Sequence, residues 1–246
     1  MNNELIVIES PKSPEAEMFK NLRTNIQFMS TNSEKKVILM TSTIPGEGKS
    51  YVTSNLGAAF AQLNKKVLIV DVDLRKGRQY SIFGAHPRPG ISNYLSGVVD
   101  QDFIGNKDEI ENYIQPTFVD NLYLISSGSV PPNPSELLIS TKMYNLIENL
   151  KKKFDIILFD APPTLIVTDA LVLTRVVDFT IIVSAQNVTK IEDLQKAKQS
   201  IENVGGKIAG VVLNKVQLTG KTYEKSYYYG RKSYVTGGKK PKKRTR

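Results

Sequence analysis

The chain has 246 residues, of which 40% are hydrophobic and 23% charged, a globular composition that excludes wholesale disorder. It has no cysteine, which excludes disulfide frameworks, thiolate zinc sites and cysteine nucleophiles, and its single histidine removes most histidine-based chemistry. No apolar run approaches the roughly 20 residues that span a bilayer, and the first ten residues do not resemble a signal peptide, so we expect a cytoplasmic protein.

The net charge of +9 is confined to the end of the chain. Residues 221–246 contain ten lysines and arginines and one acid, whereas residues 1–220 contain 23 basic and 23 acidic residues. The sequence therefore predicts one neutral domain over residues 1–220, followed by a basic tail over residues 221–246.

Helix and strand patterns alternate through the predicted domain. A helix is expected over residues 13–31, where Ser13 and Pro14 supply a cap and a first-turn proline. Residues 77–120 show the least regular pattern. Short apolar strands are expected at 37–42, 67–73, 122–126, 155–160, 179–184 and 208–214, with helices at 49–63, 135–153, 168–176 and 190–203.

This alternation is typical of an α/β fold with a parallel sheet and helices on both faces. Right-handed crossovers bring the carboxyl ends of parallel strands to one edge of the sheet, where ligands bind. We therefore look for chemistry at the ends of the predicted strands.

The first strand is followed by the segment TIPGEGKS, residues 43–50. It matches the phosphate-loop pattern G-x-x-x-x-G-K-[ST], except that Thr43 replaces the first glycine. Gly46 and Gly48 allow backbone N–H groups to surround phosphate oxygens, Lys49 can reach the β and γ phosphates, and Ser50 can ligate Mg²⁺. The expected nucleotide contacts are Thr43, Ile44, Pro45, Gly46, Glu47, Gly48, Lys49, Ser50 and Tyr51.

Carboxylates end two further strands. Asp71 and Asp73 close the segment LIVDVDLR on one side of the strand, and Asp160 closes ILFD before a proline pair. A buried carboxylate needs a cation or hydrogen bonds, and helix capping is the alternative explanation. Together with the phosphate loop, these acids predict a Mg²⁺ site formed by Ser50, Asp71, Asp73 and Asp160.

The segments TSTIPGEGKS, LIVDVDLR and ILFDAPP resemble the Walker A, A′ and B motifs of bacterial tyrosine kinases (BY-kinases), P-loop proteins related to MinD/ParA ATPases. The resemblance runs from about Glu17 to the C-terminus. It includes Gly90-Ile91-Ser92 and the stretch from Ser127-Gly128 to PPNPSELL, whose chemical roles the sequence does not reveal. The segment VVLN resembles the strand whose final asparagine, here Asn214, reads adenine in related ATPases.

The helix segment Glu17-x-x-Lys20-x-x-Arg23 resembles the family's oligomerisation motif, with Lys20 in place of an arginine. Lysine cannot reproduce a bidentate guanidinium contact, and an ordinary charged helix face is the alternative explanation. The resemblance implies a homo-oligomer, such as a ring. It further implies a transmembrane adaptor, here expected to be a separate chain that holds the kinase at the inner face of the membrane, and a cognate phosphotyrosine phosphatase.

The tail concentrates tyrosines among its basic residues. A nucleic-acid arm is one interpretation, since aromatic and basic side chains can stack on bases and bind phosphates, but nucleic acid is the less favoured partner. The resemblance implies autophosphorylation of the tail in regulating capsular or exopolysaccharide synthesis and export. An unmodified tail could also adhere to anionic lipid and be released by phosphorylation. The expected phosphoacceptors are Tyr223, Tyr227, Tyr228, Tyr229 and Tyr234.

The predicted chemistry is in-line transfer of a phosphoryl group from ATP to a tyrosine hydroxyl. Asp71 or Asp73 would accept the hydroxyl proton, with Asp71 preferred, and the other carboxylate would hold Mg²⁺ with Asp160. Lys49 and Arg75 would stabilise charge on the transferring group.

Two other functions remain open from the sequence. A MinD/ParA-type ATPase shares the fold, but its signature lysine after the first loop position is replaced by Ile44. A scaffold that binds nucleotide without turning it over, with a basic tail for nucleic acid or membrane, is the second alternative.

Overall fold

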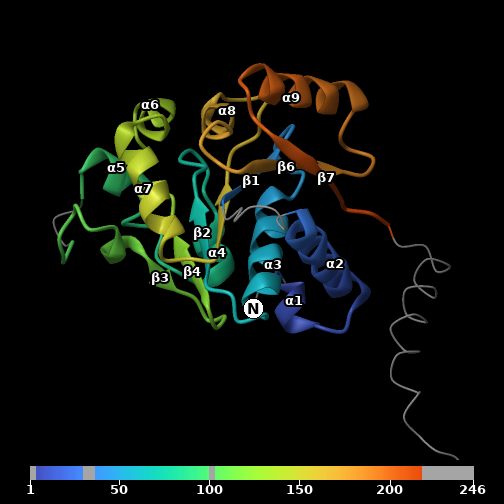
Figure 1. The fold of residues 1–246 in the computed structure, drawn as a ribbon, viewed down its shortest axis with the longest axis horizontal. Helices are drawn as coiled ribbons and strands as arrows, with labels where there is room; N and C mark the ends of the chain where they lie inside the picture. Colours follow the sequence, from blue (N-terminus) through green and yellow to red (C-terminus); the bar gives the residue numbers. More distant parts are fainter. Residues whose placement is uncertain (1–3, 30–36, 100–102, 218–246) are drawn as a thin grey trace, which may run out of the picture.

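The computed structural model describes residues 4–29, 37–99 and 103–217 and shows helices on both faces of a seven-stranded sheet (Figure 1). The strand order is β3-β4-β2-β5-β1-β6-β7, and all neighbours are parallel except the short edge pair β3 and β4. The strands are β1 (Val37–Ser42), β2 (Val67–Asp71), β3 (Gln115–Pro116), β4 (Leu122–Ile125), β5 (Ile156–Asp160), β6 (Phe179–Ala185) and β7 (Ile208–Asn214).

The helices divide between the two faces of the sheet (Figure 1). One face carries α1 (Ile6–Glu9), α2 (Pro14–Met29), α3 (Lys49–Ala61) and α4 (Gln79–Phe83). The other carries α5 (Ile91–Ser96), the 3-10 helix η1 (Ile110–Tyr113), α6 (Pro134–Leu138), α7 (Thr141–Lys151), α8 (Asp169–Leu173) and α9 (Ile191–Asn203).

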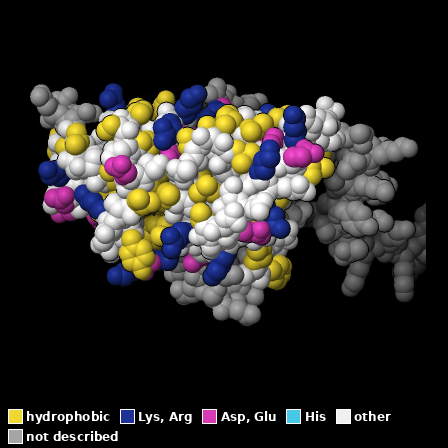
Figure 2. All heavy atoms as spheres, turned by 90° about the horizontal axis from the view of Figure 1, so that it is seen from above, with side chains coloured by type: hydrophobic (Ala, Val, Ile, Leu, Met, Phe, Trp, Pro, Cys, Tyr) yellow, Lys and Arg dark blue, Asp and Glu magenta, His cyan; other side chains and the backbone are white. Residues whose placement is uncertain are grey.

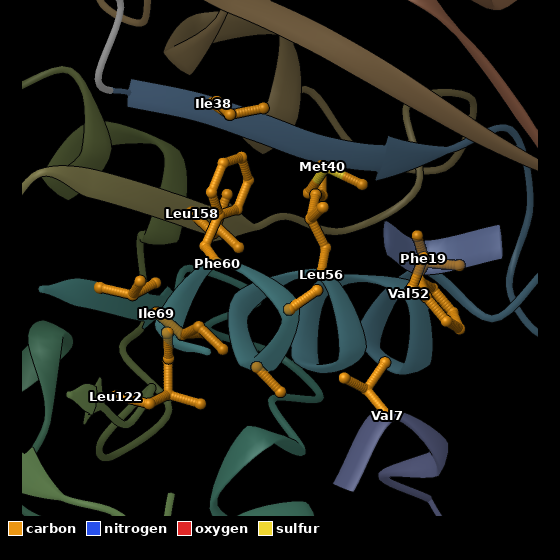
Figure 3. Close-up of a cluster of buried hydrophobic side chains, with 14 of the residues drawn as sticks. Val7, Phe19, Ile38, Met40, Val52, Leu56, Phe60, Ile69, Leu122 and Leu158 are labelled. Atoms are coloured by element: carbon orange, nitrogen blue, oxygen red, sulfur yellow. The ribbon is translucent and has the colours of Figure 1, made fainter. Parts of the chain in front are cut away.

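The central strands are buried on both faces, which explains their almost wholly apolar sequences. In β1, alternate residues enter opposite cores: Ile38 and Met40 pack under α3, whereas Val37 and Leu39 pack under the other layer. Figure 3 shows the first core, where side chains of α3 meet β1, β2 and β5. This double covering holds the strand ends of the central sheet in fixed positions.

The predicted α/β architecture is confirmed, with local differences. The helix expected over 135–153 is two helices, because Ser140 adopts an extended backbone and its hydroxyl accepts the backbone N–H of Met143 at 3.2 Å to begin α7. The strand expected over 67–73 ends at Asp71, so Asp73 lies in the loop beyond it. Helix α1, the antiparallel strand β3 and the short helices α4, α5 and η1 within residues 77–120 were not expected.

The helix predicted over residues 13–31 is α2, and its cap is confirmed by the 3.1 Å bond from the backbone N–H of Ala16 to the Ser13 hydroxyl. Residues 30–36 lie outside the described residues. Among the described residues, none of the helices has the length and hydropathy of a membrane span. The face in Figure 2 intersperses basic and acidic side chains, in keeping with a neutral domain.

Candidate nucleotide and phosphoryl-transfer site

The loop between β1 and α3 contains two glycines with left-handed backbone conformations and is closed by the end of β7. Gly46 and Gly48 have φ values of +85° and +90°, which glycine adopts readily. A Cβ on Gly48 would lie 2.1 Å from Nδ2 of Asn214, whose amide donates to the carbonyl of Glu47 at 2.9 Å. The end of β7 therefore closes directly on the loop, Gly48 is favoured by its positive φ, and a side chain there would displace the Asn214 amide.

Glu47, predicted to contact nucleotide, turns its carboxylate into the protein and is fully buried. It accepts the backbone N–H groups of Thr43 at 2.6 Å and Ile44 at 3.1 Å, and the Thr43 hydroxyl at 2.8 Å. The hydroxyl of Thr189, from the loop after β6, also contacts this carboxylate. Thr43 in place of the usual glycine is thus explained by the bond that its side chain makes to Glu47.

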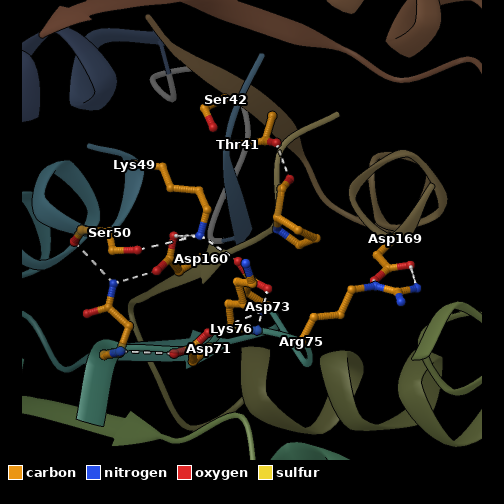
Figure 4. Close-up of polar contacts among 12 residues, drawn as sticks. Thr41, Ser42, Lys49, Ser50, Asp71, Asp73, Arg75, Lys76, Asp160 and Asp169 are labelled. Atoms are coloured by element: carbon orange, nitrogen blue, oxygen red, sulfur yellow. Dashed lines mark hydrogen bonds and ion pairs between the residues drawn. The ribbon is translucent and has the colours of Figure 1, made fainter. Parts of the chain in front are cut away.

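Lys49 lies among the predicted carboxylates (Figure 4). Its ammonium is 3.0 Å from Oδ2 of Asp73, 3.4 Å from Oδ1 of Asp160 and 3.5 Å from the Ser50 hydroxyl. Burial lowers the pKa of Lys49, but Asp160, Asp73 and Asp71 outweigh that effect and the net shift is upward. The ammonium thus lies where a cation can contact Ser50, Asp160 at the end of β5 and Asp73 just beyond the end of β2.

Asp71 and Asp160 are brought together by the register of β2 and β5, in which their Cα atoms are direct partners. Asp71 is fully buried and accepts the backbone N–H of Asp73 at 3.2 Å and of Gln79 at 2.9 Å. Burial, followed by the charge of Asp160, raises the pKa of Asp71 to about 8. The hydrogen bond from the backbone N–H of Asp73 to Asp71 also explains why Asp73, which lies beyond the end of β2, is directed back toward the site.

Gln79, at the first turn of α4, belongs to this site and was missed by the sequence analysis. Its side-chain amide donates to Oδ2 of Asp160 at 2.8 Å and to the carbonyl of Ser50 at 3.1 Å. No sequence motif marks it, because it lies in the least regular predicted segment and reaches a residue 81 positions away.

Arg75 lies on the other side of Asp73 (Figure 4). Its guanidinium donates to Asp169 of α8 at 3.0 and 3.3 Å, and the Ser135 hydroxyl donates to the same carboxylate. The side chain of Arg75 is 43% exposed, whereas that of Asp169 is buried. In this arrangement the guanidinium joins the β2–α4 loop to α8 rather than contacting the phosphate loop.

Tyr51 and Asn214 line a hollow of about 410 Å³ between α2, α3 and the end of β7. Tyr51 is half-buried against Phe19, with ring centroids 5.8 Å apart. The hollow adjoins the phosphate loop through Asn214, the residue that the sequence predicts to contact the adenine base.

The residues fit a magnesium site that is shared with a nucleotide. Within the described chain, no group of three or more histidine or acidic side chains is arranged as a ready metal-binding cluster. Mg²⁺ in phosphoryl-transfer sites usually takes one or two protein oxygens, with waters and phosphate oxygens completing its coordination. Ser50, Asp73 and Asp160, which already surround the Lys49 ammonium, are suitable donors for such a shared site.

The segment Gly90-Ile91-Ser92 contacts the stretch that begins at Ser127-Gly128, the two segments whose chemical roles the sequence does not reveal. The backbone N–H groups of Ile91 and Ser92 donate to the carbonyls of Ser126 and Ser127 at 2.8 and 3.1 Å. A Cβ on Gly90 would lie 2.2 Å from the Ser126 carbonyl oxygen. These segments therefore bind α5 to the chain beyond the end of β4.

The three residues predicted for subunit contacts lie on α2. Lys20 pairs with Glu17 at 2.7 Å and donates to the carbonyl of Pro11 at 2.7 Å. Arg23 donates to the carbonyl of Ala59 at 2.9 Å, and burial lowers its pKa. Arg23 therefore joins α2 to α3 within the subunit.

The predicted phosphoacceptors lie outside the described residues; they are Tyr223, Tyr227, Tyr228, Tyr229 and Tyr234.

Known proteins match this chain in sequence and structure. The AAA domain family matches residues 35–212. The tyrosine-protein kinase YwqD of Bacillus subtilis is 35% identical over 93% of this chain and 92% of its own. The kinase domain of Escherichia coli tyrosine kinase ETK has a TM-score of 0.79 and 31% identity, covering 87% of this chain and 82% of that one.

The cell division ATPase MinD of Pyrococcus furiosus is less similar, with a TM-score of 0.60 and 26% identity over 78% of this chain and 79% of its own. The fold is therefore shared with MinD-type ATPases, while the stronger matches are tyrosine kinases. With a phosphate loop and strand-end carboxylates converging on one lysine, the chain belongs to the bacterial tyrosine-protein kinases of the P-loop class.

Proposed function

We propose that this kinase transfers the γ-phosphoryl group of ATP, bound with Mg²⁺, to tyrosines of its own C-terminal tail. The observation that carries this proposal is the convergence of Lys49, Asp73 and Asp160 within 3.4 Å beside the phosphate loop. The proposed acceptors are Tyr223, Tyr227, Tyr228, Tyr229 and Tyr234.

Lys49 would turn from the carboxylates to the β and γ phosphates, where its ammonium stabilises charge on the transferring group. Ser50, Asp73 and Asp160 would hold Mg²⁺, directly or through water, in the region that the ammonium leaves. When bound, Mg²⁺ supplies charge neutralisation between phosphate oxygens. The geometry supports this exchange because the Lys49 ammonium contacts the same three side chains.

Asp71 is the proposed base for the tyrosine hydroxyl. Burial and the charge of Asp160 raise the pKa of its carboxyl, which makes the ionised form a stronger proton acceptor than an exposed aspartate. Asp73 lies nearer to Lys49 and is assigned to the metal. Arg75 would contribute to charge stabilisation only after leaving Asp169, so Lys49 carries the larger part of that role.

Regulation and location are proposed from the family resemblance. A homo-oligomer, such as a ring in which one subunit phosphorylates the tail of its neighbour, is compatible with the length of the tail, because a generic flexible chain of 26 residues has an r.m.s. end-to-end distance of roughly 28 Å. We propose a cytoplasmic kinase that a transmembrane adaptor holds at the membrane. A phosphotyrosine phosphatase would remove the phosphate from its tyrosines. The process that this kinase would regulate is capsular or exopolysaccharide synthesis and export.

The test is mapping of phosphosites by mass spectrometry after incubation of the purified full-length protein with Mg²⁺ and ATP. Phosphate should accumulate mainly on the five tail tyrosines. Mixing Lys49→Met protein with a tail-deleted but catalytically intact chain then reports transfer between subunits. Phosphotyrosine confined to sites outside the tail, or ATP hydrolysis without phosphotyrosine, would contradict the proposal.

A further inference from the structure

Gln79 occupies a buried position between the phosphate-loop helix and two strand ends. Its backbone N–H donates to Oδ2 of Asp71 at 2.9 Å, and its side-chain nitrogen Nε2 donates to Oδ2 of Asp160 at 2.8 Å. The same nitrogen donates to the carbonyl of Ser50 at 3.1 Å. One residue thus contacts both strand-end carboxylates and the residue that supplies the expected hydroxyl ligand.

The orientation of the Gln79 amide is fixed by its partners. Nε2 faces a carboxylate and a carbonyl, both of which only accept hydrogen bonds, so exchanging the amide nitrogen and oxygen would place three acceptors together. Oε1 is buried and has no hydrogen-bond partner among the described residues. A buried acceptor without a partner is unfavourable, which indicates that the donation to Asp160 and Ser50 determines this conformation.

The two oxygens of Asp160 have different partners. Oδ2 accepts from Gln79, while Oδ1 is 3.4 Å from the Lys49 ammonium, the group that occupies the cation position. A carboxylate whose one oxygen is held by an amide presents its other oxygen in a defined direction. Residues that orient metal ligands in this way generally alter metal affinity by 10- to 100-fold when they are replaced.

We propose that Gln79 is a positioning residue for Mg²⁺: its amide holds Oδ2 of Asp160 and directs Oδ1 toward the metal of the bound nucleotide. This inference rests on the proposed Mg²⁺–nucleotide function of the site. Gln79 touches neither phosphate nor tyrosine in this role and acts through Asp160. Since its backbone N–H is retained in any side-chain variant except proline, the contact to Asp71 is unaffected by the test.

The experiment compares wild type with Gln79→Met, which keeps side-chain length but lacks the amide. Full-length protein is titrated with Mg²⁺ in the presence of a fluorescent ADP analogue, and analogue binding is measured separately without metal. We expect the apparent Kd for Mg²⁺ to rise about 10-fold or more, while the affinity for metal-free analogue changes less than about twofold. Mn²⁺ binding followed by electron paramagnetic resonance provides a second readout independent of phosphorylation.

Thr180→Val is the matched control, because the Thr180 hydroxyl is also buried without a hydrogen-bond partner in the described residues but lies near the start of β6. It should leave the Mg²⁺ titration unchanged. Gln79→Leu is measured in parallel so that a fold defect in one variant does not decide the result.

The outcomes separate the two proposals. If wild type shows no Mg²⁺ dependence, the proposed metal function fails. If wild type responds to Mg²⁺ and the folded Gln79 variants respond equally, the positioning role is overturned. If metal-free analogue binding falls as much as Mg²⁺ binding, Gln79 supports the loop structurally and the metal-specific role is likewise overturned.

Discussion

The edge of the sheet that carries Asp71 and Asp160 and the described part of the segment from Gly90 to Ser129 are held in place in different ways. At the edge, Asp71 and Asp160 are direct register partners on neighbouring parallel strands, buried between two hydrophobic cores. In the segment, short helices and turns are bound by contacts such as the backbone bond from Ile91 to Ser126 at 2.8 Å. The first arrangement follows from strand pairing, whereas the second depends on close approach of particular backbones.

This difference shows which parts of the molecule tolerate change. Strand register is maintained by many backbone bonds, so a single side chain at the edge can be replaced with a local, chemical effect. The segment contains positions where a single methyl group would meet backbone atoms. Substitutions at the edge should therefore alter chemistry more than folding, and those in the segment should do the reverse.

Lys49→Met should have the largest effect on chemistry. Loss of the ammonium removes the expected stabilisation of the transferring group, and we expect autophosphorylation to fall by about 10²–10³-fold. Phosphotyrosine formation by purified protein is the measurement, with circular dichroism as the check on folding. Lys49→Arg retains a cation beside Asp73 and Asp160 and serves as the control for charge loss. Labelling of Lys49→Met at the wild-type rate would refute the role of this lysine.

Gly90→Ala should have the largest effect on folding. Its Cβ would lie 2.2 Å from the Ser126 carbonyl oxygen and 2.3 Å from the Gly128 nitrogen, so backbone must move. We expect the free energy of unfolding to fall by about 1–3 kcal/mol, measured by denaturant titration. At Gly210, an added Cβ meets nothing within 4 Å, so Gly210→Ala is the matched control. Equal stability of the two variants would contradict the proposed contact.

Glu47→Gln should weaken the phosphate loop without unfolding the protein. The amide oxygen of glutamine could still accept the N–H groups of Thr43 and Ile44, but the amide nitrogen would replace the carboxylate oxygen that accepts the Thr43 and Thr189 hydroxyls, and the negative charge that strengthens all of these bonds would be lost. We expect the Kd for nucleotide to rise about 10-fold, measured by calorimetry, as for loss of one hydrogen bond to a charged group. Thr189→Val removes only one donor to Glu47 and should have a smaller effect. A larger loss in Thr189→Val than in Glu47→Gln would exclude this explanation.

Asp71→Asn removes the proposed base, and apart from that loss of phosphorylation it should have the smallest effect on stability of these variants, seen in the pH dependence of unfolding. Because the pKa of Asp71 is raised from 3.8 to about 8, the folded protein keeps a proton that the unfolded chain releases above pH 4. The unfolded state therefore binds fewer protons between about pH 4 and 8, and the free energy of unfolding falls as pH rises through this window.

Removing the titrating group should make that pH dependence shallower. The measurement is denaturant unfolding at several pH values from 4 to 9, without nucleotide or divalent metal. An identical slope in wild type and Asp71→Asn would show that Asp71 is not the responsible group.

Much of the site could be predicted because its residues are adjacent in sequence to recognisable elements. Lys49 and Ser50 begin α3 directly after β1 and its glycine loop, and Asp71 and Asp160 end apolar strands. The prediction was less accurate where a helix or strand ended. The break between α6 and α7 depends on the cap at Ser140, and the helix periodicity on both sides of it continues.

The sequence by itself determined the phosphate loop, the acidic strand ends and the separate basic tail, because short-range spacing and composition encode them. Only the tertiary structure decided that Glu47 faces inward, that Arg75 binds Asp169 and that Gln79 holds Asp160. These contacts join side chains that could each have faced solvent or another partner. Their choice depends on how the loops pack over the strand ends, which no local pattern specifies.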